Sequence, residues 1–189
     1  MTEEPEAQLR VAILVASDRA ASGERPDATG PRLEEFLRVG ARHVARSPGD
    51  RHPGPQGLGA LPVQVVEILV VPDERQQIAD ALRQLSDRAD VVLTAGGTGL
   101  AARDVTPEAT ASVIERQAPG IAEAMRAAGL RTTPHAMLSR GIAGVRGRSL
   151  IINLPGSPRG AVESLAAVWP AVPHAIAIIT GAATDRSHT

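Results

Sequence analysis

The sequence contains no cysteine and no tyrosine, and it has a single tryptophan and a single phenylalanine among its 189 residues. The absence of cysteine excludes disulfides, thiolate zinc sites and cysteine nucleophiles. Lysine is absent as well, since all 20 basic residues are arginine, and this excludes a Schiff-base lysine or a lysine nucleophile. The negative charge of a bound phosphate must therefore be met by arginine, by backbone amides or by a metal ion.

Charge is nearly balanced along the chain. The formal net charge is -1 and the pI is about 6.5, so the overall charge does not favour binding to nucleic acid or to a membrane surface. The five histidines show no paired spacing of the kind that zinc sites use. We find no signal peptide and no apolar run of 18 residues, and we therefore expect a cytoplasmic protein.

A chain of this length is expected to form one domain with a full hydrophobic core. We place that domain at residues 10–181, between a polar lead-in at residues 1–9 and a loose tail at residues 182–189. Residues 40–62 are rich in glycine, proline and arginine and lack apolar periodicity, which favours an extended surface insertion. The arginines of this insertion could instead bind a ligand, and the sequence leaves that open.

Apolar strands alternate with amphipathic helices through most of the chain. Continuous apolar runs predict strands at residues 11–16, 63–71, 91–93 and 149–154. This alternation is typical of an α/β fold, and we predict a three-layer α/β/α sandwich with a mostly parallel sheet. The residues expected on the core faces of the helices are Leu33, Phe36, Leu37, Ile78, Leu82, Leu85, Ile121, Met125, Ala128, Val162, Leu165, Ala166 and Trp169.

Residues 91–110 combine a strand, a glycine loop and the start of a helix. Gly96, Gly97 and Gly99 allow a tight turn with exposed N–H groups after the strand. Thr106 is the expected N-cap, so a helix should begin just after residue 104. Loop amides and a helix N-terminus together can bind a phosphate, although a glycine pair after a strand can also serve only to turn the chain.

Two acidic residues at strand ends indicate a metal site. Asp104 lies in the glycine loop, where it would repel a bound phosphate unless a divalent cation lay between them. No lysine follows the glycines and their spacing is not GxGxxG, so neither a Walker loop nor a dinucleotide fingerprint is present. Asp73 follows the second strand, where it could cap the next helix or join Asp104 at one metal ion.

Polar residues also follow the first and last predicted strands. Ser17 and Asp18 come at the end of the first strand, where open α/β sheets bind ligands. Asp27, further along the same loop, is expected to form a turn rather than a substrate contact, although the sequence allows either role. Ser157 is predicted to cap the helix that begins with Pro158 after the last strand.

Five motifs follow one another along the chain: SDRAASGERPDATG, VVPDE, TAGGTGLAARDVTPEAT, MLSRGIAGVRG and LIINLPGSPRG. In this order they resemble the MogA/MoaB family of molybdenum cofactor biosynthesis, which includes molybdopterin adenylyltransferases and a domain of gephyrin. The resemblance runs from about residue 11 to residue 181. It implies a homotrimer of the molybdopterin-binding, MogA-like fold, with the pocket at the carboxyl ends of the strands.

The resemblance also implies an activity: Mg²⁺-dependent transfer of AMP from ATP to molybdopterin, giving adenylylated molybdopterin and pyrophosphate. Asp73 and Asp104 are then the catalytic acids and the metal ligands, ATP and molybdopterin are the substrates, and other proteins of molybdenum cofactor biosynthesis are expected partners. The residues expected to bind substrate are Ser17, Asp18, Asp27, Gly96, Gly97, Thr98, Gly99, Arg103, Ser139, Arg140, Pro155, Gly156 and Ser157.

Two departures from the family pattern and two rival functions stay open. Ala95 stands where the family often has Thr or Gly before GGTG, and we expect this difference to be tolerated. The insertion at residues 40–62 is longer than in compact bacterial members, and its function stays open. One rival is a non-catalytic pterin-binding or scaffold trimer of the MoaB type, which the presence of both Asp73 and Asp104 disfavours. The other is a nucleotide pyrophosphatase resembling CinA, and the RDVTPEA sequence favours transfer over it.

Overall fold

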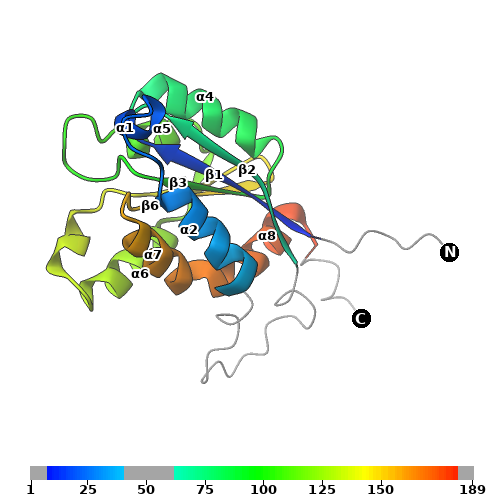
Figure 1. Cartoon of the computed structure of the whole chain (residues 1–189). Helices are drawn as coiled ribbons and strands as arrows, with labels where there is room; N and C mark the ends of the chain where they lie inside the picture. Colours follow the sequence, from blue (N-terminus) through cyan, green and yellow to red (C-terminus); the bar gives the residue numbers. More distant parts are fainter. Residues whose placement is uncertain (1–7, 41–61, 183–189) are drawn as a thin grey trace, which may run out of the picture.

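The computed structural model describes residues 8–40 and 62–182. The predicted tail and most of the predicted lead-in and insertion lie outside the described residues, so the expectations for them stay predictions. Within the described chain, the predicted three-layer α/β/α sandwich is confirmed: helices cover both faces of one sheet (Figure 1).

The sheet has six strands in the order β2-β1-β3-β6-β5-β4. β1 pairs in parallel with β2 and β3, and β3 pairs in parallel with β6, so four adjacent strands run in one direction. The remaining pairs are antiparallel, because β5 pairs in that sense with both β6 and β4. The strands are β1 (Leu9–Ala16), β2 (Val63–Val71), β3 (Val91–Ala95), β4 (Arg116–Gln117), β5 (Ala143–Arg146) and β6 (Ser149–Leu154).

Helices cover the two faces of the sheet with separate hydrophobic clusters. One cluster joins α4 and α5 to the sheet residues Leu14, Val92 and Ile151. The other joins α2, α6, α7 and α8 to the alternate residues of the same strands, which face the other side of the sheet, including Ile13 and Leu93. The helical elements are α1 (Asp18–Ala21), α2 (Thr29–Glu35), η1 (Phe36–Gly40), α4 (Arg75–Ser86), α5 (Thr106–Ala111), α6 (Pro119–Leu130), η2 (Pro134–Leu138), α7 (Pro158–Val168), η3 (Trp169–Ala171) and α8 (Val172–Thr180).

Most of the helix faces predicted to be in the core are buried. Ile78, Leu82 and Leu85 form the buried face of α4, and Trp169 is a core residue. The predicted capping role of Thr106 is wrong: Val105 is the N-cap residue of α5, and the hydroxyl of Thr106 is buried without a hydrogen-bond partner among the described residues.

A buried amide links the glycine-loop helix to the sheet. Asn153 in β6 donates from its side-chain nitrogen to the hydroxyls of Thr94 in β3 and Thr110 in α5, at 3.0 and 2.9 Å. Its side-chain oxygen accepts from the backbone N–H of Ile142 at 3.3 Å. Because a buried polar group without partners is costly, this satisfied amide fixes α5 against the carboxyl-terminal half of β3 and β6.

One helical stretch departs from the expectation that the chain lacks an apolar run of 18 residues. Pro158–Thr180 is long and apolar enough, by length and composition, to cross a membrane, with a mean hydropathy of 1.5. It comprises α7, η3 and α8, and one side of it packs on the sheet through Leu165, Trp169, Val172 and Ile176. The apolar composition therefore supplies part of the core of this domain.

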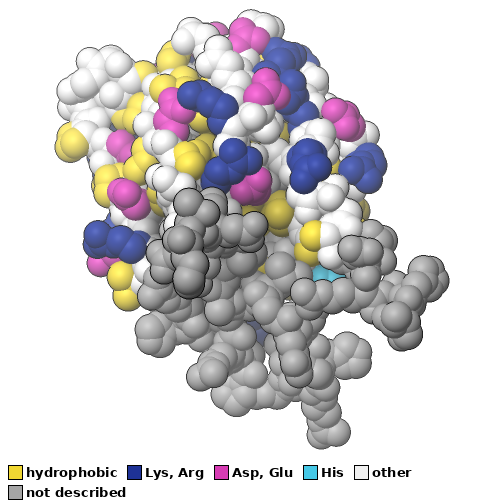
Figure 2. Space-filling model, turned by 90° about the vertical axis from the view of Figure 1, so that its right-hand side faces the viewer, with side chains coloured by type: hydrophobic (Ala, Val, Ile, Leu, Met, Phe, Trp, Pro, Cys, Tyr) yellow, Lys and Arg dark blue, Asp and Glu magenta, His cyan; other side chains and the backbone are white. Residues whose placement is uncertain are grey.

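Charged side chains of both signs are interspersed on the side of the molecule that lies away from the carboxyl ends of the parallel strands (Figure 2). Arginine and acidic residues alternate there rather than gathering by sign. Ion pairs on the protein surface include Arg83 with Asp80 and Arg88 with Glu67. The groups that could bind a charged ligand are therefore best sought at the opposite edge of the sheet, where the parallel strands end.

Candidate functional site

The carboxyl ends of four parallel strands deliver polar residues to one edge of the sheet. β1 leads into Ser17 and Asp18, and β2 leads through Pro72 into Asp73. β3 leads into the glycine loop, and β6 leads into the segment that contains Gly156. Open α/β sheets bind ligands at this edge because loops from adjacent strands converge there.

The glycine loop after β3 has, at two positions, a backbone conformation that strongly favours glycine. Gly96 and Gly97 have φ of 102° and 61°, a region that other residues rarely adopt. Side chains would also clash: a Cβ on Gly96 would overlap the carbonyl oxygen of Ala16, and one on Gly97 would overlap the hydroxyl of Thr106. The loop is closed by the backbone N–H of Thr106, which donates to the carbonyl of Gly97 at 3.1 Å.

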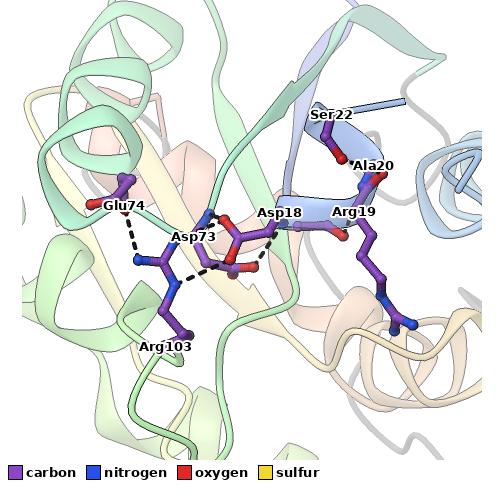
Figure 3. Close-up of polar contacts among 8 residues, drawn as sticks. Asp18, Arg19, Ala20, Ser22, Asp73, Glu74 and Arg103 are labelled. Carbon is purple, nitrogen blue, oxygen red and sulfur yellow. Dashed lines mark hydrogen bonds and ion pairs between the residues drawn. The ribbon is translucent and has the colours of Figure 1, made fainter. Parts of the chain in front are cut away.

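Asp18 and Asp73 hold each other in a reciprocal pair of hydrogen bonds (Figure 3). The backbone N–H of Asp18 donates to the carboxylate of Asp73, and the backbone N–H of Asp73 donates to the carboxylate of Asp18, both at 2.9 Å. The predicted alternative in which Asp73 caps α4 is wrong, because Glu74 is the N-cap residue and makes no side-chain capping bond. The ends of β1 and β2 are therefore joined through their acids.

Arg103 reaches from the glycine loop to this acidic pair. Its guanidinium donates to both carboxylate oxygens of Asp18, at 2.8 and 3.1 Å, and to the carboxylate of Glu74 at 2.7 Å (Figure 3). Such two-point contacts are specific to the planar guanidinium group. Arg19, next to Asp18 in sequence, points away from the cluster in Figure 3, so among the described residues it is Arg103 that bonds to Asp18 and Glu74.

The two acids of the pair have opposite pKa shifts. Hydrogen bonds from Arg103, with a further one from the backbone N–H of Asp73, hold the pKa of Asp18 below its ordinary value. Burial raises the pKa of Asp73, and the negative charges of Asp18 and Asp104 add to that rise against the hydrogen bond from Asp18. Asp73 is therefore a carboxylate whose charge is poorly compensated, and a cation beside it would stabilise its ionised form.

Asp104 lies at the other end of the glycine loop. One of its carboxylate oxygens accepts from the backbone N–H of Ala101 at 2.8 Å. A Cβ added to Gly99 would lie 2.8 Å from the same oxygen. At the start of the loop, a Cβ added to Gly97 would lie 3.2 Å from the carboxylate of Asp73. The two acids predicted as metal ligands thus border the same short loop, each with its second carboxylate oxygen accepting no hydrogen bond from the described residues.

A metal ion at this loop would have few protein ligands. Within residues 8–40 and 62–182, no group of three or more histidine, cysteine, aspartate or glutamate residues is arranged to hold a metal ion. Asp73 and Asp104 could contribute one oxygen each, which suits Mg²⁺, because that ion usually keeps waters and binds through one or two carboxylates and substrate phosphates. The donor set therefore fits a cation brought to the site with a phosphate ligand.

The remaining predicted residues on the other side of the loop serve mainly to shape it. The carboxylate of Asp27 accepts from the backbone N–H groups of Thr29 and Gly30, at 2.7 and 3.0 Å, which is the turn-forming role. The hydroxyl of Thr29 donates to the carbonyl of Gly156 at 2.9 Å. Ser157 caps α7 as predicted, accepting from the N–H of Gly160 at 3.2 Å.

Gly156, between Pro155 and Ser157, packs closely on the glycine loop. A Cβ on Gly156 would lie 3.2 Å from the Cα of Gly96, and the N–H of Gly96 donates to the carbonyl of Leu154 at 3.2 Å. The segments after β3 and β6 are therefore adjacent, as their predicted place in one pocket requires.

Ser139 and Arg140 line a hollow of about 320 Å³ together with Gln117, Arg126 and neighbouring residues of α6 and β5. The hydroxyl of Ser139 accepts from the N–H of Gly141 at 3.3 Å. The side chain of Arg140 contacts the carbonyls of Gly99 and Asp104 and the carboxylate of Glu108. The structure therefore places Arg140 next to the loop, as predicted, with its guanidinium directed at protein acceptors.

Sequence reasoning missed several residues of the site. Glu74 and Glu108 pair with Arg103 and Arg140, which lie 29 and 32 positions away along the chain. Nothing in a single sequence marks such distant pairs. The sequence marks Thr106 only as a helix start, and its proximity to Gly97 follows from the turn of the loop rather than from its own residue type.

The fold and the site define an α/β protein with a phosphate-compatible loop and paired acids at the carboxyl edge of a parallel sheet. Residues 12–174 match the family model described as a probable molybdopterin binding domain. That match spans most of the chain, so the chain belongs to this family, and the resemblance found in the sequence is confirmed.

Individual relatives agree with the family assignment. A curated relative named molybdopterin adenylyltransferase, from Helicobacter pylori strain J99, is 39% identical over 175 residues, which are 92% of this chain and 89% of the relative. The solved structure of the molybdopterin biosynthesis enzyme MoaB from Thermus thermophilus is 47% identical, with a TM-score of 0.76, and the match covers 92% of this chain and 98% of that one.

A more distant structure bears on one rival function. The protein CinA from Thermoplasma acidophilum, of unknown function, is 20% identical to this chain with a TM-score of 0.59, and the match covers 86% of this chain and 98% of that one. An identity this low shows a common fold alone. It gives no support to a pyrophosphatase activity in this chain.

Replacing Arg103 with methionine should raise the pKa of Asp18 toward its ordinary value, because the two-point hydrogen bond from the guanidinium is lost. A lowered folded-state pKa stabilises the fold at pH above the unfolded-state pKa, and that contribution disappears as the pH falls through the folded value. The variant should therefore lose stability at neutral pH and lose less in acid. Carboxyl titration by ¹³C NMR and unfolding at several pH values measure both effects.

The matched control is Arg19→Met, which removes a neighbouring guanidinium that points away from the acids. Its Asp18 pKa should stay at the parent value. An Arg103→Met variant whose Asp18 titrates as in the parent would show that Arg103 does not set the charge of this cluster.

Proposed function

We propose that this protein transfers AMP from ATP to the terminal phosphate of molybdopterin, giving adenylylated molybdopterin and pyrophosphate, in molybdenum cofactor biosynthesis in the cytoplasm. The observation that supports it most is the position of Asp73 and Asp104 at the two ends of a glycine loop on the carboxyl edge of the sheet. Curated relatives named molybdopterin adenylyltransferase, at 38–39% identity, support the choice of substrates.

The chemistry asks mainly for positioning and charge neutralisation. A phosphate oxygen of molybdopterin attacks the α-phosphorus of ATP, the new P–O bond forms as the bond to the leaving pyrophosphate breaks, and no strong base is needed because the attacking phosphate is already ionised. The absence of lysine and of a histidine pair is therefore compatible with the reaction. Mg²⁺, held by Asp104 and Asp73, would supply Lewis-acid stabilisation of the phosphate charge.

Different residues at the carboxyl edge of the sheet would carry out the positioning and the charge neutralisation. Asp18 and Arg103 hold Asp73 and the far side of the loop in place through their hydrogen bonds. The amides that follow Gly96 in the glycine loop, next to Gly156, would be the neutral donors to phosphate oxygens. The hollow beside Ser139 is also lined by Arg140, which bonds to the glycine loop, and it would offer space for the acceptor.

Transfer is favoured over the two rival functions by specific features of this edge. A scaffold that only binds a pterin has no need for a poorly compensated carboxylate such as Asp73, whose burial raises its pKa. A pyrophosphatase would need room for an attacking water rather than for a second large substrate, and the hollow of about 320 Å³ lined by Ser139 and Arg140 would provide room for an acceptor.

Asp104→Asn should slow AMP transfer by roughly a thousandfold or more, because several kcal/mol of transition-state stabilisation depend on the metal that the carboxylate holds. Asparagine keeps an oxygen for the N–H of Ala101, so the loop should stay folded. Affinity for molybdopterin measured without ATP should remain near that of the parent. The measurement is adenylylated product formation alongside pterin affinity.

The control for this variant is Asp80→Asn, which neutralises an exposed acid on α4 that pairs with Arg83. Its transfer rate should equal that of the parent. Near-normal turnover in Asp104→Asn would remove Asp104 from the mechanism, and joint loss of turnover and pterin binding would make it a folding or substrate-site residue.

We further propose that the protein is a homotrimer. Large apolar side chains are exposed at the end of α6 and in η2, where Leu130, Met137 and Leu138 are 47%, 61% and 47% accessible. A partner surface that covers them would remove this apolar area from water. Light scattering at micromolar concentration should give three times the 19.6 kDa mass of the chain, and a monomer mass would contradict the proposal.

A further inference from the structure

One side chain bonds to the glycine loop at two points, Gly99 and Asp104. Arg140 donates from Nε to the carbonyl of Gly99 at 2.6 Å, and from its terminal nitrogens to the carbonyl of Asp104 and the carboxylate of Glu108. Its backbone N–H donates to the carbonyl of Thr98 at 2.9 Å. All three guanidinium nitrogens therefore face acceptors in the loop or in the first turn of α5.

These contacts set the distance across the loop. The carbonyls of Gly99 and Asp104 lie at either end of the exposed segment 100–103, and one planar group bonds both. Within the segment, Ala101 and Asp104 are joined by short-range bonds, from the N–H of Asp104 to the carbonyl of Ala101 and from the N–H of Ala101 to the carboxylate of Asp104. Arg140 thus connects an exposed turn to the half-buried segment behind it.

Arg140 is itself anchored from behind. Arg126 in α6 donates to the carbonyls on both sides of it, those of Ser139 and Gly141, at 3.4 and 3.0 Å. Glu108 depends on Arg140 in turn. The hydrogen bond from Arg140 lowers the pKa of Glu108, and the other carboxylate oxygen of Glu108 is buried without a hydrogen-bond partner among the described residues. The chain therefore has a continuous connection from α6, through Arg140, to the loop and to α5.

We propose that Arg140 is a positioning residue that holds the glycine loop and Asp104 in the arrangement needed by the metal-bound nucleotide, rather than a substrate contact. The inference rests on the proposed function for the identity of the nucleotide, MgATP. The effect of Arg140 on the loop does not depend on any ligand. A preformed loop saves the ordering cost that binding would otherwise carry, so losing the clamp should weaken MgATP binding.

Two variants separate positioning from simple charge compensation. Arg140→Lys keeps a positive charge near Glu108, but a single ammonium group cannot bond the carbonyls of Gly99 and Asp104 with the fixed fork of a guanidinium. The double variant Arg140→Met/Glu108→Gln removes both charges and leaves no unpaired carboxylate, so it stays foldable if the single loss is too disruptive. Arg83→Lys, in an exposed ion pair with Asp80 on α4, is the matched control.

The experiment measures hydrogen–deuterium exchange of the ligand-free protein and MgATP affinity by calorimetry. In both Arg140 variants the amides of Ala101, Asp104 and Thr106 should exchange about tenfold faster or more, because bonds to a charged group that restrain the loop are lost. Amides of β1 and β6, together with the melting temperature of the double variant, should stay close to the parent. MgATP affinity should fall about tenfold in both variants and remain unchanged in Arg83→Lys.

The outcomes are distinct. Parent-like loop exchange in Arg140→Lys and in the double variant would overturn the inference, whatever the nucleotide affinity. Recovery of both loop exchange and MgATP affinity in the double variant would show that Arg140 only compensates the charge of Glu108, and would overturn it too. A parent protein that binds no MgATP would count against the proposed function, while the loop exchange would still decide the role of Arg140.

Discussion

Repulsion among carboxylates at the carboxyl ends of parallel strands is the constraint on which this site depends. β1, β2 and the loop after β3 bring Asp18, Asp73 and Asp104 to one edge, and the charges of Asp18 and Asp104 add to the rise that burial causes in the pKa of Asp73. Arg103 compensates Asp18 and leaves Asp73 with little neutralisation. A cation beside Asp73 would stabilise its ionised form, and this links the fold to the proposed nucleotide chemistry.

The sequence predicted the parallel part of the fold because buried parallel strands are continuously apolar. The strand at residues 149–154 and the start of β3 at Val91 match the structure. β4 and β5 could not be predicted in the same way, since β4 consists of only two residues, both exposed, and β5 is a run of four residues interrupted by Gly144. Their antiparallel arrangement beside β6 is fixed by tertiary contacts and by the turn at Gly147.

The site was predictable in position but not in its internal bonding. Strand ends and glycines located Asp73, Asp104 and the loop, because the geometry of parallel sheets dictates where such residues meet. Partner choice was not predictable: Asp73 accepts from the N–H of Asp18 instead of capping α4, and the guanidinium of Arg140, predicted to bind substrate, bonds to the glycine loop. Those outcomes depend on distances between elements that a single sequence does not encode locally.

The proposal that this edge transfers AMP, rather than only binding a pterin or hydrolysing a nucleotide, is tested most directly by one assay. Purified protein is mixed with ATP, Mg²⁺ and molybdopterin, and adenylylated molybdopterin and pyrophosphate are quantified together, with each substrate omitted in turn. The account predicts that the two products appear in equal amounts and only when both substrates are present. Pyrophosphate release without molybdopterin, or binding of molybdopterin with no product, would contradict it.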